Sequence, residues 1–270
     1  PELIPNLKGS FTTEYADDNW RLMTYVPGKS YDGLETPEQA YEAGAALARF
    51  HTAVADLDIV ISNQRPHVHD TVRHIQNLCD ALEEHADHTR FAHIVPLAGT
   101  ILSSAAALPA INLDAVRLVH GDPKISNLLF DDAGKSLCWV DLDTLAHMPL
   151  ALEMGDAFRS WCNPESEDAE TGEFSLEYFT AAANGYAEYA GVFLEAVEWR
   201  AFLDGTQTIL VELAARFCAD ALNESYFGWD QRRFVTRGEH NEARARNQLK
   251  VLESFLNQHE QCIAALEQAF

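Results

Sequence analysis

The chain has 270 residues, 47% of them hydrophobic, and its 42 acidic and 19 basic side chains give a formal net charge of -23. This length can bury a large core, in one domain or in two smaller ones. The strong acidity argues against nucleic acid and anionic membrane as partners, because both carry the same sign of charge. No apolar run approaches the roughly 20 residues that a membrane helix needs.

The five cysteines are scattered along the chain, odd in number and without a CxxC pair. This usage is typical of reduced thiols rather than of a disulfide framework. We therefore expect a cytoplasmic protein.

The first third of the sequence predicts a hairpin followed by helices. Residues 10–15 and 19–26 read as two strands joined by a turn, and Pro27-Gly28 ends the second strand. Thr36 then offers an N-cap, with Pro37 at the first helical position and Gln39 to complete a capping box. Two further helical stretches are expected at about 70–86 and 92–107.

The pattern changes to short β-branched runs after residue 115 and returns to helix near residue 150. Residues 115–119, 127–130 and 136–140 predict strands, with a glycine-containing turn between the last two. Further helices are expected at about 152–162, 175–191, 194–223 and from 241 to the end, and the acidic stretch 163–173 is interpreted as a mobile loop. The fold class predicted is α+β and predominantly α-helical.

Five polar residues follow these short strands at a distinctive spacing. His120, Asp122 and Asn127 form H-x-D-x-x-x-x-N directly after a strand, and Asp141 follows the second strand of the next hairpin. This is the spacing of a protein-kinase catalytic loop and its metal-binding aspartate. Asp122 would accept a proton from an incoming hydroxyl, His120 would orient the loop backbone, and Lys124 would face the transferring phosphoryl group. The alternative is a plain turn with capping carboxylates; the combination of motifs favours the phosphotransferase.

The motifs "HGDPKISNLLF", "VDLDT" and "GDAFRSW" resemble those of the aminoglycoside phosphotransferase and choline kinase superfamily. The run "WVDLDTLAHMPLALEMGDAFR" is most similar to the N-acetylhexosamine 1-kinase-like branch, as are "EAGAALARFH" and "RGEHNEARARNQL". The resemblance implies a protein-kinase-like C-terminal lobe over residues 29–270. Residues 1–28 would be only a remnant of the N-terminal β-lobe with its hinge.

The resemblance also implies roles for single residues. Asp122 would be the catalytic base, with Asn127 and Asp141 as ligands of Mg²⁺. Asp156 would brace the catalytic loop by accepting its backbone N–H groups. The backbone of Thr24, Tyr25 and Val26 would contact the adenine of ATP. Asp143 is expected to be either a supporting residue behind the metal ligands or a helix cap.

The usual phosphate-binding parts of such kinases are missing before the hinge. No GxGxxG motif occurs there, and Lys8 is the only lysine in that stretch. We therefore expect the chain to be a fragment of a longer product that binds ATP poorly by itself.

The acceptor site is predicted mainly by analogy with the family. The segment 215–230 contains hydrogen-bonding and aromatic side chains that could contact an acceptor. The alternative is that these side chains pack in the protein core. Trp161 is a weaker candidate, and His67, His69 and His74 are interpreted as surface histidines rather than metal ligands. The candidates for acceptor contact in this segment are Arg216, Asn223, Tyr226 and Trp229.

The sequence as a whole predicts an ATP- and Mg²⁺-dependent kinase of a small hydroxylated molecule, most plausibly a sugar or amino sugar. Two alternatives stay open. The first is a non-catalytic sensor or scaffold that kept the acceptor pocket. The second is a kinase of another acceptor, such as an aminoglycoside, choline or homoserine.

Overall fold

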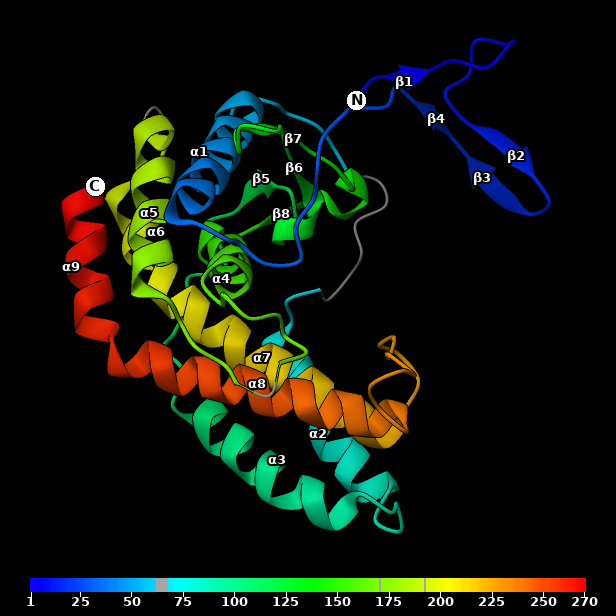
Figure 1. The fold of residues 1–270 in the computed structure, drawn as a ribbon, viewed down its shortest axis with the longest axis vertical. Coiled ribbons are helices and arrows are strands. Elements are labelled where there is room, and N and C mark those ends of the chain that lie inside the picture. Colours follow the sequence, from blue (N-terminus) through cyan, green and yellow to red (C-terminus); the bar gives the residue numbers. More distant parts are fainter. Residues whose placement is uncertain (62–67, 170, 192) are drawn as a thin grey trace.

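The computed structural model describes residues 1–61, 68–169, 171–191 and 193–270. Helices dominate this part of the chain, and strands occur only in short pairs. The prediction of a mainly helical α+β fold is therefore confirmed. Figure 1 shows a helical body from which an N-terminal β-arm projects.

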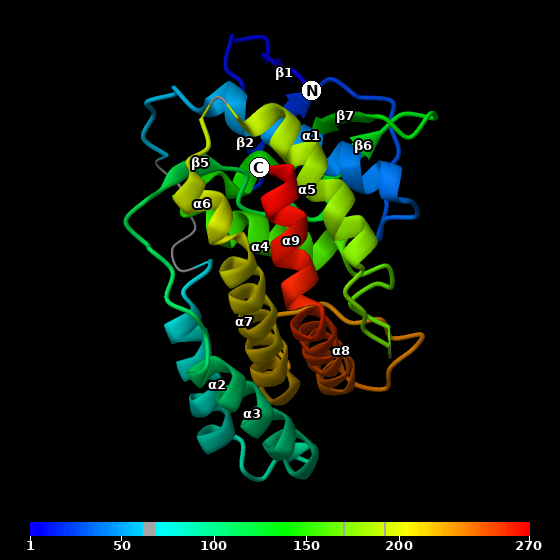
Figure 2. The same ribbon diagram turned by 90° about the vertical axis from the view of Figure 1, so that its left-hand side faces the viewer.

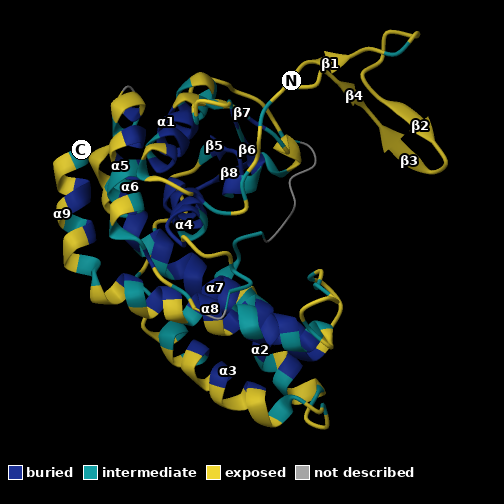
Figure 3. Ribbon diagram, viewed as in Figure 1, coloured by how far each residue is buried: buried dark blue, intermediate teal, exposed yellow. Residues whose placement is uncertain are grey.

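The N-terminal arm consists of two small antiparallel pairs. β1 (Leu3–Ile4) pairs with β4 (Leu22–Met23), and β2 (Thr13–Tyr15) pairs with β3 (Asp18–Trp20). The turn between β2 and β3 has positive φ at Ala16 and Asp17, as a two-residue hairpin requires. This confirms the predicted hairpin. No residue among 1–28 is buried, and Figure 3 shows most of the arm as exposed.

The helical body is organised around α7 (Phe202–Asn223), of which 18 of 22 residues are buried. It packs against α8, α4, α2 and α3, while α1 packs against α5. In Figures 1 and 2 the α2–α3 pair lies at the opposite end of the body from the β-hairpins. The remaining helices are α1 (Pro37–Val54), α2 (Thr71–Glu84), α3 (Phe91–Ala106), α4 (Leu150–Trp161), α5 (Leu176–Ala190), α6 (Ala196–Arg200), α8 (Arg237–Asn257) and α9 (His259–Ala269).

The predicted N-cap and first residue of α1 are confirmed, but the predicted capping box is not closed. The hydroxyl of Thr36 accepts the backbone N–H of Gln39 at 3.3 Å, and Pro37 is the first helical residue. The Gln39 side chain turns back and accepts the N–H of Glu35 at 2.8 Å. The first bond satisfies an N–H group that a helix start otherwise leaves without a partner. The second holds the residue before the cap, where a capping box would instead bond the N–H of Thr36.

Two more strand pairs carry the polar motifs. β5 (Arg117–Val119) pairs with β8 (Ala146–Met148), and β6 (Leu128–Phe130) pairs with β7 (Ser136–Trp139). Short 3₁₀ turns, Ile125–Asn127 and Leu142–Thr144, lead into β6 and β8. Asn127 thus ends a turn rather than beginning a strand as predicted. The chain leaving the arm crosses this region, where Lys29 and Phe130 exchange backbone hydrogen bonds at 2.8 Å.

The acidic stretch 163–173, interpreted from its composition as a mobile loop, is anchored to α8. The side-chain amide of Asn247 donates to the carbonyls of Ala169 (3.0 Å) and Thr171 (2.6 Å). Arg233 donates to the carbonyl of Asp168 at 2.8 Å. Composition alone did not reveal these anchors, because the donors lie more than 60 residues away in the sequence.

In the described ranges, none of the helices combines the length and the apolarity that crossing a bilayer demands.

The contact between α1 and α5 depends on two glycines. A Cβ at Gly44 would lie 2.0 Å from the carbonyl oxygen of Ala182, and one at Gly185 would lie 2.0 Å from that of Tyr41. Both neighbours are backbone atoms of the facing helix, so no side-chain rotation can relieve the clash. The two helices can therefore approach this closely only because both positions are glycine.

We predict that Gly44→Ala lowers the free energy of unfolding by about 2 kcal/mol or more, since the helices must separate. Gly99→Ala in α3 is the matched control, because nothing lies within 4 Å of its added Cβ. The control should be neutral or stabilising by about 0.5–1 kcal/mol. Urea unfolding of both variants measures this, and equal stability of the two would contradict the close packing described.

Candidate active site

The H-G-D loop after β5 is shaped by a glycine in a left-handed conformation. Gly121 has φ +83°, and a Cβ there would lie 2.0 Å from the carbonyl oxygen of Thr144. The Thr144 hydroxyl donates to the carbonyl of His120 at 2.9 Å. The loop and the segment after β7 therefore touch backbone to backbone, which only glycine permits.

His120 orients this loop, as predicted. The residue is fully buried, and its Nε2 lies 3.0 Å from the carbonyl oxygen of Val140. Its Nδ1 accepts the backbone N–H of Asp122 at 3.4 Å. A neutral ring with the proton on Nε2 satisfies both contacts. His120 thus ties Asp122 to the strand that leads to Asp141.

Asp122 is held by two of the predicted site residues. Its Oδ2 lies 2.7 Å from Lys124 Nζ and 3.1 Å from Asn127 Nδ2. Burial lowers the pKa of Lys124, but the hydrogen bond and charge of Asp122, together with the charge of Asp141, outweigh it and raise the pKa. Lys124 therefore stays protonated and positively charged beside the Asp122 carboxylate. Within the described residues, Oδ1 of Asp122 has no hydrogen-bond partner and is the oxygen open to a ligand.

Asn127 and Asp141 lie at the same end of the β6–β7 hairpin. Leu128 pairs with Trp139, and the N–H of Val140 donates to the carbonyl of Asn127 at 2.9 Å. Asp141 follows at once, exposed and in a left-handed conformation with φ +60°. Such a conformation is uncommon outside glycine and is often found at functional sites.

The donor set at this hairpin end suits a hard cation. The Asn127 amide nitrogen already donates to Asp122, both to its carbonyl (2.9 Å) and to its carboxylate, which leaves the amide oxygen for a ligand. One carboxylate and one amide oxygen are the kind of partial shell that Mg²⁺ completes with water and phosphate oxygens. In the described parts of the chain, no group of three or more His, Cys, Asp or Glu side chains is placed to hold a metal ion.

The residue that braces the catalytic loop is Glu153, not Asp156 as predicted. Glu153 is fully buried, and its two carboxylate oxygens accept the backbone N–H groups of His120 and Gly121, each at 3.0 Å. Asp156 lies one turn later on α4 and instead pairs with Arg159 at 3.0 Å. Burial raises the pKa of Asp156, but the charges of Arg159 and of His69 outweigh it, so the pKa lies below its usual value.

Two further residues of α4 form hydrogen bonds with the backbone just after the H-G-D sequence. Trp161 is fully buried, and its indole N–H donates to the carbonyl of Pro123 at 2.8 Å. The Ser160 hydroxyl accepts the N–H of Ile125 at 3.1 Å. Trp161 therefore supports the catalytic loop, and the idea that it contacts the acceptor is wrong.

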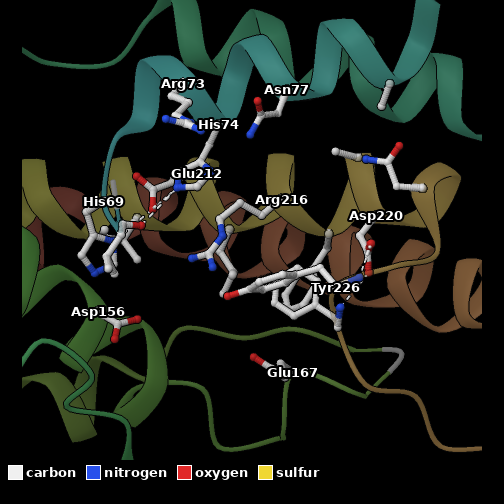
Figure 4. Close-up of a pocket in the computed structure, with 18 of the residues that line it drawn as sticks. His69, Arg73, His74, Asn77, Asp156, Glu167, Glu212, Arg216, Asp220 and Tyr226 are labelled. Atoms are coloured by element: carbon white, nitrogen blue, oxygen red, sulfur yellow. Dashed lines mark hydrogen bonds and ion pairs between the residues drawn. The ribbon is translucent and has the colours of Figure 1, made fainter. Parts of the chain in front are cut away.

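Asp122 and Lys124 open into a cavity of about 970 Å³ between the catalytic loop, α2, α4 and α7. Figure 4 shows that side chains from all three helices face it. Of the predicted acceptor contacts, Arg216, Asn223 and Tyr226 line the cavity. Trp229 does not appear among the described lining residues, because the chain turns away after Phe227.

Arg216 and Tyr226 are held in place within this wall. The Arg216 guanidinium lies over the Tyr226 ring at 5.8 Å and over the Phe227 ring at 5.6 Å. The buried carboxylate of Asp220 accepts the backbone N–H groups of Tyr226 (2.9 Å) and Phe227 (2.8 Å). The aromatic segment is thus pinned to the end of α7. Oδ1 of Asn223 lies 2.9 Å from Nε2 of His85, within hydrogen-bond distance.

The sequence did not reveal a buried His–Glu pair at the other end of the cavity. His69 Nδ1 lies 3.0 Å from Glu212 Oε1, the Thr71 hydroxyl donates to Glu212 Oε2 at 2.7 Å, and His74 is 4.0 Å from the same carboxylate. His69 and His74 are therefore cavity residues rather than ordinary surface histidines, while His67 lies outside the described residues. The sequence feature that could have indicated this pair is Glu212, a single acidic residue in an otherwise apolar stretch of α7.

The predicted hinge, Thr24 to Val26, lies at the base of the arm. The N–H of Thr24 is already bonded to the carbonyl of Glu2 at 2.9 Å, and Tyr25 is highly exposed. Just before the hinge, Arg21 forms an ion pair with Asp143 at 2.6 Å. Asp143 therefore joins the arm to the hairpin that carries Asp141, and the adenine contact of the hinge stays a prediction.

We predict that Glu153→Gln lowers the free energy of unfolding by about 1–3 kcal/mol, because an amide NH₂ would then face a backbone N–H in a buried site. Glu253→Gln, an exposed position on α8, is the control and should change stability by less than about 0.5 kcal/mol. Chemical denaturation at pH 7 measures both. A stable Glu153→Gln variant would show that the brace is dispensable.

We predict that the contribution of His69 to stability declines as pH rises. Burial lowers the pKa of His69, but the hydrogen bond and charge of Glu212 and the charge of Asp156 outweigh it and the opposing charge of Arg216, so the pKa is raised above 6.5. The stabilisation relative to His69→Gln is therefore complete below pH 6.5 and is lost as pH rises through the folded-state pKa.

Urea unfolding of the wild type and of His69→Gln at pH 6 and pH 9 measures this difference. The exposed His93 provides the control variant, His93→Gln, which should show no such trend. A stability difference that grows from pH 6 to pH 9 would contradict the charged His69–Glu212 pair.

Comparison with known proteins agrees with this geometry. The model of the phosphotransferase enzyme family (APH) matches residues 5–192. Choline kinase from Cryptosporidium parvum Iowa II is 12% identical, over 99% of this chain and 76% of that chain, with a TM-score of 0.53. An aminoglycoside phosphotransferase from Alicyclobacillus acidocaldarius is 16% identical, over 99% and 76% of the two chains, with a TM-score of 0.47.

At 12% identity and a TM-score of 0.53, the choline kinase shows a shared fold and confirms the expected kinase-like lobe. The family model covers more than half of the chain, including β5, the H-G-D loop, the β6–β7 hairpin and α4. The chain therefore belongs to the phosphotransferase enzyme family (APH).

Proposed function

We propose that this protein transfers the terminal phosphoryl group of ATP to a hydroxyl group of a sugar or amino sugar. The observation that carries the proposal is the position of Asp122. Its carboxylate opens into the 970 Å³ cavity, while Lys124 and Asn127 hold its other oxygen. An acceptor in the cavity would present a hydroxyl to the free oxygen of Asp122.

Asp122 would act mainly by orienting that hydroxyl and accepting its proton late in the reaction. A carboxylate is a weak base, which is sufficient because phosphoryl transfer has a loose transition state. Lys124 would leave Asp122 to neutralise charge on the transferring group, since both lie on the same side of the cavity. Most of the rate enhancement would then come from positioning and charge neutralisation.

Asn127 and Asp141 would hold Mg²⁺ through one amide oxygen and one carboxylate. The bound ion would neutralise the phosphates of the nucleotide. Glu153 and His120 would keep the loop that carries Asp122 in register with these two ligands. Thr24 to Val26 would contact the adenine.

The charge of the cavity supports an aminated acceptor. Seven carboxylates line it against four Lys or Arg side chains, an excess that favours a cationic ligand. The lining also offers hydrogen-bonding groups suited to hydroxyls, among them Asn77, Asn223 and Tyr226. An amino sugar with a free amine satisfies both features, whereas an N-acetylhexosamine, whose nitrogen is an uncharged amide, satisfies only the second. The five cysteines are free thiols, which supports a cytoplasmic location.

The decisive experiment measures ADP release by the protein and by its Asp122→Asn variant. The acceptor panel contains hexosamines, N-acetylhexosamines, aminoglycosides, choline and homoserine, with ATP and Mg²⁺. Turnover with an amino sugar is expected, and Asp122→Asn should reduce kcat by about 10³-fold or more while leaving ATP affinity nearly unchanged.

Asp131 is half-buried on the β6–β7 turn and does not line the cavity, so Asp131→Asn, whose side-chain oxygen can still accept the turn's N–H groups, is the matched control and should keep wild-type turnover. Turnover of Asp122→Asn at the wild-type rate would refute the proposed base. Binding of an acceptor without any ADP release by the wild type would favour the non-catalytic alternative.

A further inference from the structure

Two segments from distant parts of the sequence form one wall of the cavity. The loop 163–173 contributes Glu167, and the segment 224–229 contributes Tyr226 and Phe227. Figure 4 shows Glu167 and Tyr226 on the same side of the cavity, facing Arg216. The residues of these two segments that the structure describes (163–169, 171–173 and 224–229) form no helix or strand, so backbone hydrogen bonds of regular structure do not hold them.

Arg244 of α8 connects the two segments from behind. Its Nε donates to the carboxylate of Asp168 at 2.6 Å, and its Nη1 donates to the carbonyl of Gly228 at 2.8 Å. Asp168 directly follows Glu167, and Gly228 directly follows Phe227. One planar guanidinium therefore sets the separation of both segments, an arrangement that the shorter, point-like ammonium of lysine cannot reproduce.

His240, one turn earlier on α8, makes the same connection. Its Nε2 lies 2.8 Å from Asp168 Oδ1, and its Nδ1 accepts the N–H of Asp230 at 3.1 Å. The ring is buried and stacks on Phe234 at 4.1 Å. Burial and the charge of Arg244 lower the pKa of His240 in spite of Asp168, so the ring stays neutral, as the acceptor role of Nδ1 requires.

Asp168, His240 and Arg244 do not themselves line the cavity in the described part of the structure. Arg244 and His240 converge on a single oxygen of Asp168, and Arg244 Nε also lies 3.9 Å from Oε1 of the lining residue Glu167. A plain surface ion pair would tolerate rotation of either partner. Here Arg244 and His240 join the two segments to each other, whereas Asn247 and Asp220 each hold only one of them.

We propose that Asp168, His240 and Arg244 form a latch that positions Glu167 and Tyr226 for acceptor binding. This inference rests on the proposed function, since it assigns the wall to the acceptor. The three are positioning residues, and they are distant from Asp122 in the sequence and separate from the hairpin that would hold Mg²⁺. Loosening the latch should therefore weaken acceptor binding without slowing the transfer step.

The test compares the variants Asp168→Asn, Arg244→Gln and Arg244→Lys with the wild type, using the acceptor of highest turnover from the panel. Each should raise the acceptor KM by about tenfold, with kcat and the KM for ATP changed less than about twofold. Arg244→Lys should lie between Arg244→Gln and the wild type. Arg246→Gln is the control, because Arg246 lies on the same helix, is half exposed and pairs with Glu242 instead.

Hydrogen exchange of the same variants provides a readout that needs no acceptor. Asp168→Asn should increase amide exchange in both 163–169 and 224–236, because one latch holds both. Increased exchange confined to 163–169, or a fall in kcat with an unchanged acceptor KM, would overturn the latch. If the wild type turns over none of the acceptors, the proposed function fails, and the exchange result alone then decides whether the two segments are coupled.

Discussion

The site depends on one buried carboxylate that grips two backbone N–H groups. Glu153 is removed from water entirely, which is costly for a charge unless its oxygens are well bonded. The backbone N–H groups of His120 and Gly121 donate those hydrogen bonds. Without Glu153 these two N–H groups would be buried without an acceptor, because the tight loop has none of its own in reach. The loop therefore has one conformation in which its polar groups are satisfied, and in it Asp122 faces the cavity.

The helices α4 and α7 fix the position of this loop relative to the cavity. α4 holds the loop through Glu153, Ser160 and Trp161, and its own position is fixed by its packing against α7. α7 in turn lines the cavity from Glu212 at one end to Asp220 at the other. Asp122 and the α7 side of the cavity are thus attached to a single packed pair of helices, and the function proposed above requires this rigidity to place a hydroxyl group accurately.

Local patterns in the sequence predicted local structure well. The capping residues around Thr36, the β2–β3 hairpin and the H-x-D-x-x-x-x-N spacing are short-range signals, and the structure contains all three. Long-range contacts were less accessible. Asp156 and Glu153 lie one turn apart on α4, and only the packing of that helix decides which carboxylate reaches the loop. The His69–Glu212 contact joins residues 143 apart, and the loop 163–173 is anchored by side chains of α8.

The ion pair between Arg21 and Asp143 has a consequence for the N-terminal arm. Both side chains are nearly half exposed, so water and dissolved ions screen their attraction, which contributes at most about 1 kcal/mol. The arm carries no buried residues to add a hydrophobic hold of its own. Its orientation over the β6–β7 hairpin therefore varies with ionic strength: the arm is drawn toward the hairpin in dilute buffer and swings more widely in concentrated salt.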